Sequence, residues 1–194
     1  MSETRRIGVL GIGNVLMGDD GVGPYTVKML EARYKFPKQV ELQDVGTPGL
    51  GITSVFSEFD AVILIDAVNA KKNPGEVKVY RKNELVQVPL KQRVSPHDPA
   101  LVEALLFAEL SGKCPKEVLL VGVVPETCEL NCGLSAAVQA GVETAIGVVL
   151  VELEQLGAPV KLKSRPDVPS IWWEKEARTD SLVEGLAHVS GHPG

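Results

Sequence analysis

Short apolar segments alternate with amphipathic ones along most of this chain, and the alternation predicts a mixed α/β protein. Apolar runs of strand length cover residues 6–12, 61–65 and 117–124, as in parallel strands that are buried on both faces. Residues 40–44 alternate like a further strand, and helical spacing covers about 22–34, 50–57, 99–110 and 135–156. Residues 76–81 alternate charged and apolar side chains, which is typical of an edge strand, and we expect this strand to run antiparallel.

The order of these elements, βαβαββαβα, predicts an α/β fold with three layers. We expect a twisted, mostly parallel five-stranded sheet with helices on both faces and one antiparallel edge strand. The chain has 194 residues, enough for one core, so a single domain over 1–158 is expected. Residues 159–194 change in character and are expected to form a partly disordered tail. Its Trp172-Trp173 pair is expected to pack back on the body, with partner docking as the alternative.

Composition and charge exclude several classes of partner. The net charge is −5, and no run of Lys or Arg is longer than a pair, so binding to nucleic acid or to an anionic membrane is not expected. No uncharged apolar stretch reaches the roughly 20 residues that span a bilayer, which favours a cytoplasmic protein. The cysteines are Cys114, Cys128 and Cys132, an odd number that favours free thiols over a disulfide framework.

Three residues that are distant in sequence are candidates for one metal site. Asp20 lies in the loop after the first strand, Asp66 follows the central apolar strand, and His97 precedes a helix. Open α/β sheets place their chemistry at the carboxyl ends of parallel strands, and two carboxylates with an imidazole can hold one divalent ion. The alternatives are that Asp66 caps a turn and that His97 is a solvated surface residue.

The glycine-rich first loop does not fit a nucleotide site. Gly11 and Gly13 follow the first strand as in a dinucleotide fingerprint, but the next glycine is Gly18, and the chain has no Gly-Lys-Ser motif. The carboxylates of Asp19 and Asp20 would also repel a pyrophosphate. Motifs for a zinc protease, a serine nucleophile or a Cys–His pair are absent as well. The residues alone therefore favour a divalent cation site and do not name a reaction.

Five sequence blocks resemble, in order and at similar spacing, the signature segments of the nickel-iron hydrogenase maturation endopeptidases. The resemblance extends over residues 6–156. The blocks are Gly11-Ile-Gly-Asn-Val-Leu-Met-Gly-Asp-Asp-Gly-Val-Gly23, Asp44-Val-Gly-Thr47, Ile65-Asp-Ala67, Ser95-Pro-His97 and Leu120-Val-Gly-Val-Val-Pro-Glu126.

The resemblance implies an endopeptidase that removes a C-terminal extension from the precursor of a hydrogenase large subunit once nickel has been inserted. It implies that Asp20, Asp66 and His97 are the metal-binding and catalytic residues, and that the nickel is supplied by the substrate. Another divalent cation could occupy the site in the isolated protein. The resemblance also assigns recognition of the cognate precursor to the segment with Asp44, Gly46 and Thr47. The chain departs from the family at Asp20, where some members have Glu, and at Val45, where Gly is frequent.

One mechanism is consistent both with a divalent cation site and with the endopeptidase resemblance, and we state it as a hypothesis. A polarised water attacks the peptide carbonyl, and Asp19 or a ligand carboxylate is the general base. The alternatives are a nickel-binding accessory protein and a small-molecule-binding α/β module, neither with proteolytic activity. A monomer is expected.

Overall fold

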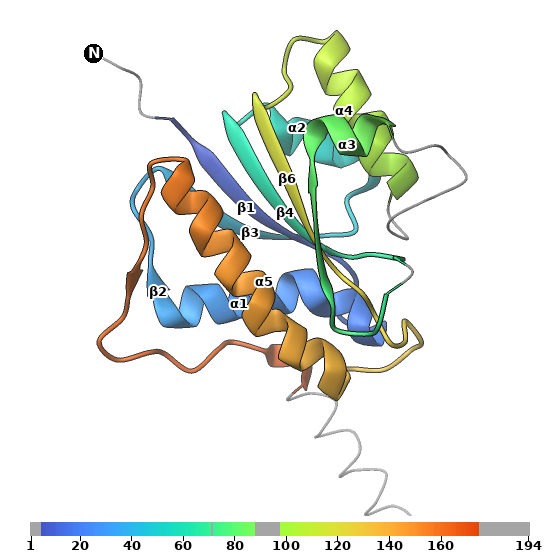
Figure 1. The fold of residues 1–194 in the computed structure, drawn as a ribbon, viewed down its shortest axis with the longest axis vertical. Helices are drawn as coiled ribbons and strands as arrows, with labels where there is room; N and C mark the ends of the chain where they lie inside the picture. Colours follow the sequence, from blue (N-terminus) through green and yellow to red (C-terminus); the bar gives the residue numbers. More distant parts are fainter. Residues whose placement is uncertain (1–4, 71, 88–97, 175–194) are drawn as a thin grey trace, which may run out of the picture.

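The computed structural model describes residues 5–70, 72–87 and 98–174, and a five-stranded sheet forms their centre (Figure 1). The strands are β1 (Ile7–Ile12), β3 (Val40–Gly46), β4 (Ala61–Ala67), β5 (Val77–Arg81) and β6 (Glu117–Val123). Their spatial order is β3-β1-β4-β6-β5. The first four are parallel and β5 runs antiparallel to β6. The predicted fold class is thereby confirmed, including the antiparallel edge strand.

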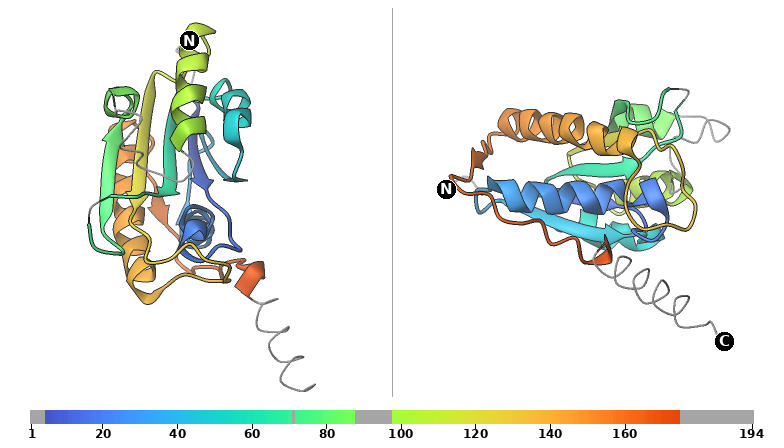
Figure 2. Two further views of the ribbon diagram at one scale, coloured as in Figure 1. Left: turned by 90° about the vertical axis from the view of Figure 1, so that its right-hand side faces the viewer. Right: turned by 90° about the horizontal axis from the view of Figure 1, so that it is seen from below.

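Helices cover both faces of the sheet and form two separate apolar cores (Figures 1 and 2). One face carries α1 (Val22–Arg33) and α5 (Ala136–Gln155). The other carries α2 (Ile52–Phe56), α3 (Lys82–Gln87) and α4 (Asp98–Leu110). Every residue of β1 and β4 is buried, because both strands have two sheet neighbours and a helical layer on each side. These two strands therefore form a rigid base for the loops at their carboxyl ends.

Helix α5 is long and apolar enough to span a membrane by length and composition. In this fold it is a core helix, because its apolar face packs against β6 and α1 through side chains such as Val142, Ala145 and Val149. Its start matches the prediction: Ser135 is the N-cap, and its Oγ accepts a hydrogen bond from the amide of Val138 at 3.3 Å.

Two pieces of secondary structure are not evident in the sequence pattern. Helix α3 is a short helix directly after β5, and a two-stranded antiparallel ribbon pairs β2 (Tyr34–Lys35) with β7 (Lys161–Leu162). Both are only a few residues long, too short for a periodicity to be detected.

The ribbon begins a C-terminal strap, which we define as residues 159–174. The strap runs alongside α1 (Figures 1 and 2) and is tied to the end of that helix. The amide of Lys163 donates to the carbonyl of Arg33 at 2.9 Å, and the amide of Asp167 to that of Ala32 at 2.9 Å. At the other end of the strap Trp173 is buried, as expected, while Trp172 is half exposed. Residues 175–194 lie outside the described residues.

Candidate active site

The first loop is folded tightly against the carboxyl ends of the two central strands. Gly13 has φ +138°, and a methyl group there would lie 1.8 Å from the carbonyl oxygen of Asp20. At Gly23, a methyl group would lie 2.2 Å from the carbonyl oxygen of Ile12 and 2.4 Å from that of Ile65. The glycines thus allow α1 to begin directly at the ends of β1 and β4. This close approach brings Asp20 to the end of the sheet at which Asp66 lies.

Asp20 and Asp66 are both buried carboxylates, with 5% and 0% of the residue exposed. Asp20 lies in a 3-10 turn, η1 (Gly18–Gly21), where its Oδ2 accepts the amide of Asn14 at 2.8 Å. Asp66 lies within β4, one residue before its end, whereas the sequence predicted that it follows the strand. Its Oδ1 accepts the amide of Ala67 at 2.8 Å. A buried carboxylate is costly unless it is hydrogen-bonded, paired or metal-bound, so this pair is a candidate for chemistry.

The thiol of Cys128 shows that these carboxylates share one neighbourhood. Burial is the first cause that raises the pKa of Cys128 to about 11, and the negative charges of Asp20, Asp19 and Asp66 raise it further. A cysteine nucleophile needs a lowered pKa, so the protonated Cys128 thiol does not suit a cysteine peptidase. The sequence alone identified Cys128 only as a loop thiol, because the three carboxylates that raise its pKa come from other segments.

Asp19 has a different environment from Asp20. Its carboxylate is fully buried and accepts four hydrogen bonds from residues 126–135, at 2.7–3.2 Å. Both oxygens are therefore engaged by the loop between β6 and α5. This geometry suits a structural role for Asp19 better than that of a general base.

His97, the third candidate ligand, lies outside the described residues, directly before α4. Within the ranges 5–70, 72–87 and 98–174 no group of three His, Cys, Asp or Glu side chains is arranged to hold a metal ion. Asp20 and Asp66 would therefore need a further ligand, from the rest of the chain or from a bound molecule. The ligand role of the three residues stays a prediction.

The segment with Asp44, Gly46 and Thr47 lies next to the first loop. It ends β3, and the carbonyl of Gly46 accepts the amide of Gly13 at 2.9 Å. The Asp44 carboxylate accepts the amide of Gly46 at 3.0 Å, which holds the turn, and Asp44 and Thr47 are exposed. A segment at this position can contact a molecule that binds at the carboxyl end of the sheet.

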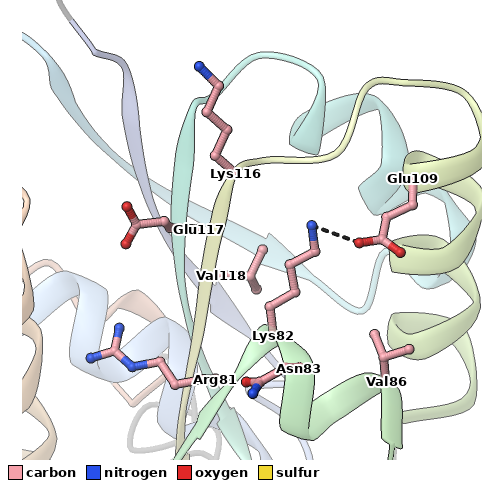
Figure 3. Close-up of a pocket in the computed structure, with 8 residues that line it drawn as sticks. All are labelled: Arg81, Lys82, Asn83, Val86, Glu109, Lys116, Glu117 and Val118. Carbon is pink, nitrogen blue, oxygen red and sulfur yellow. Dashed lines mark ion pairs between the residues drawn. The ribbon is translucent and has the colours of Figure 1, made fainter.

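Two pockets lie at opposite ends of the sheet. A pocket of about 360 Å³ borders the acidic turn and is lined by Gly18, Asp19, Thr127, Ser135 and Glu174, among others. The other, of about 400 Å³, lies at the start of β6 (Figure 3). There Lys82 points at Glu109 with an ion pair of 2.8 Å, while Lys116 points away from them. The polar pocket beside Asp19 is the one that adjoins the buried carboxylates.

The fold and the site define an α/β protein with a group of buried carboxylates at the carboxyl end of its parallel strands. A family model described as hydrogenase maturation protease matches residues 24–152. The hydrogenase 2 maturation protease of Escherichia coli (strain K12) is 39% identical over 153 residues, which cover 78% of this chain and 93% of that protein. The chain belongs to the hydrogenase maturation protease family and is a peptidase. The resemblance seen in the sequence blocks is thereby confirmed.

Further relatives agree in sequence and in structure. The hydrogenase expression/formation protein HupD of Bradyrhizobium diazoefficiens is 33% identical over 166 residues, 85% of this chain and 86% of that protein. The structure of the hydrogenase maturating endopeptidase HybD from E. coli superposes with a TM-score of 0.74 at 36% identity, covering 82% of this chain and 98% of that one. The [NiFe] hydrogenase maturation protease HybD from Thermococcus kodakarensis gives 0.62 at 27% identity, covering 78% and 98%.

Proposed function

We propose that this protein removes the C-terminal extension from the precursor of a nickel-iron hydrogenase large subunit after nickel has been inserted. In this proposal the nickel is part of the substrate, and Asp20, Asp66 and His97 bind it from the protease side. The observation that carries the proposal is that Asp20 and Asp66 are both buried at the same end of the sheet, where the turn η1 packs against β4. Oxygen and imidazole ligands suit a borderline divalent ion such as nickel.

The chain's own residues would then act by position and charge. Asp20 and Asp66 would fix the nickel-bearing segment of the precursor, so that the scissile peptide lies in one register with respect to the sheet. The carboxylate that accepts the proton of the attacking water would be Asp20 or Asp66, since Asp19 is engaged by the loop. The exposed Asp44 and Thr47 would contact the precursor beside this site and contribute to its selection. We expect the protein to act on this precursor in the cytoplasm and as a monomer.

The test is cleavage of purified nickel-loaded and nickel-free precursor, followed by gel electrophoresis and mass spectrometry of the C-terminus. The wild-type protein should shorten only the loaded precursor. Asp66→Asn should reduce the rate about 100-fold or more, because a neutral amide both binds the cation less well and cannot serve as a base.

Asp60→Asn is the matched control. Asp60 also accepts a backbone amide, that of Arg6 at 2.8 Å, but it lies at the opposite end of β4. This variant should cleave at the wild-type rate. Normal processing by Asp66→Asn, or equal cleavage of nickel-free precursor, would contradict the proposal. Tight nickel binding without cleavage by the wild-type protein would favour an accessory role instead.

A further inference from the structure

The carboxylate of Asp19 joins two segments that are more than a hundred residues apart. Its Oδ2 accepts the amides of Glu126 at 2.9 Å and Thr127 at 3.2 Å, and also the hydroxyl of Ser135 at 2.9 Å. Its Oδ1 accepts the amide of Ser135 at 2.7 Å. Asp19 thus holds both ends of the loop 126–135, at the point where the chain has left β6 and at the N-cap of α5. We refer to these four hydrogen bonds as the Asp19 clamp.

Backbone hydrogen bonds extend the contact between the acidic turn and this loop. The amide of Asp19 donates to the carbonyl of Thr127 at 3.0 Å, and the amide of Gly18 to that of Asn131 at 2.7 Å. The amide of Asn131 in turn donates to the carbonyl of Leu16 at 3.0 Å. The turn and the loop therefore form one hydrogen-bonded unit. The same loop carries Cys128, whose pKa is raised by burial and by the charges of Asp20, Asp19 and Asp66.

We propose that Asp19 is a positioning residue: through the clamp it sets where Asp20 stands relative to the loop 126–135. Asp20 is the next residue in the same short turn, and its own carboxylate is directed at the amide of Asn14. Any displacement of Asp19 is passed on to Asp20 through a single peptide unit. This inference rests on the proposed function for its catalytic consequence, while the clamp itself depends only on the structure.

A carboxylate is required at this position because all of its partners donate. An ionised carboxylate can accept at both oxygens, whereas the side-chain amide introduced by Asp19→Asn presents one acceptor and one NH₂ donor. In one orientation that NH₂ group would face the amide of Ser135, and in the other it would face the amides of Glu126 and Thr127. Either orientation opposes donor to donor in a buried place, which costs more than the loss of one hydrogen bond.

The experiment compares Asp19→Asn, Ser135→Ala and the double variant with the wild-type protein, and reads kcat and KM separately on nickel-loaded precursor. Asp19→Asn should lower kcat about 10–100-fold, the range expected when a reacting group is displaced by about 1 Å, with KM changed less than about threefold. Ser135→Ala removes one of the four hydrogen bonds of the clamp, together with the N-cap bond from the amide of Val138, and should lower kcat less. The double variant should be no slower than Asp19→Asn alone, because both changes act on one unit.

Arg81→Ala controls for a general loss of stability, since it disrupts a partly buried ion pair at the opposite end of the sheet. It should leave kcat unchanged at temperatures well below its Tm. An equal fall of kcat in Arg81→Ala and Asp19→Asn would overturn the positioning role, and so would a wild-type kcat in Asp19→Asn.

Amide hydrogen exchange tests the clamp without reference to cleavage. In Asp19→Asn, or in Ser135→Ala if the former does not fold, the amides of Glu126 and Thr127 should exchange at least about tenfold faster than in the wild-type protein. The amide of Asn14, which reports on Asp20, should do the same. Unchanged exchange at Asn14 would overturn the inference even if the wild-type protein proved inactive. A wild-type protein that does not cleave, together with faster exchange at Asn14, would instead contradict only the proposed function.

Discussion

Removal of the Arg81 side chain should destabilise the protein more than neutralisation of its partner, Glu152. The guanidinium binds the Glu152 carboxylate through two hydrogen bonds of 2.6 and 2.8 Å, which join the end of β5 to α5. The two members of the pair differ in exposure: the Glu152 side chain is 6% exposed and that of Arg81 48%. Arg81→Ala therefore leaves a buried carboxylate without its cation, whereas Glu152→Gln leaves a guanidinium that water already reaches.

The magnitude follows from this asymmetry. Breaking a fully buried ion pair costs about 3–5 kcal/mol. Water screens the exposed half of Arg81, so the expected loss for Arg81→Ala is about 1–3 kcal/mol. For Glu152→Gln, in which hydrogen bonds from Arg81 to the amide oxygen remain possible, the expected loss is below about 1 kcal/mol.

Urea unfolding followed by far-UV circular dichroism measures both losses, provided that the slope of the free energy against urea stays constant. The double variant Arg81→Met/Glu152→Leu should recover much of the stability lost in Arg81→Ala, because an apolar pair carries no desolvation penalty. The reasoning would be refuted if Glu152→Gln lost as much stability as Arg81→Ala, or if the double variant was no more stable than Arg81→Ala.

Three further predictions concern the site loop, the close helix contact and the strap. Because the pKa of Cys128 is raised to about 11, its alkylation by iodoacetamide at about pH 8.5 should be about 100-fold slower than that of an ordinary thiol. The alkylation rate should increase up to about pH 11. The stability that depends on the protonated thiol is present below about pH 9 and is lost toward about pH 11. Gly23→Ala should cost about 3 kcal/mol in chemical denaturation, because its methyl would collide with two carbonyl oxygens. Gly147→Ala in α5, where nothing lies within 4 Å, should instead stabilise by up to about 1 kcal/mol. Trp173→Ala should cost about 3–5 kcal/mol, seen as a lower Tm, and a Tm equal to the wild-type value would show that the strap does not contribute to the core.

The sequence sufficed for the fold because its longest elements have clear periodicities. The buried strand 61–65, the edge strand 76–81 and the capped helix after Ser135 are all present in the structure, with boundaries that shift by one or two residues. Helix α3 and the β2–β7 ribbon were not predictable, since two to six residues carry too little pattern and depend on contacts with distant segments.

The candidate site could be predicted only in part. Asp66 was a candidate because a carboxylate at the carboxyl end of an apolar strand is unusual, and Asp20 because it is an acid in the glycine-rich loop after the first strand. Both signals lie within a few neighbouring residues. The separate role of Asp19 could not be found in this way. Its partners, Glu126, Thr127 and Ser135, are more than a hundred positions away, and in the sequence Asp19 and Asp20 are simply two adjacent acids.

The strap has a practical consequence for the handling of this protein. It returns the chain from the far end of α1 to the polar pocket beside Asp19, where Glu174 is one of the lining residues. Residue 5, by contrast, leads into β1 at the opposite end of the sheet. An affinity tag or fluorescent label joined just after Glu174 would therefore be attached beside the surface that a macromolecular substrate must approach. A label joined directly before residue 5 would be attached at the far end of the sheet, and this position is the better choice for binding measurements and for immobilisation.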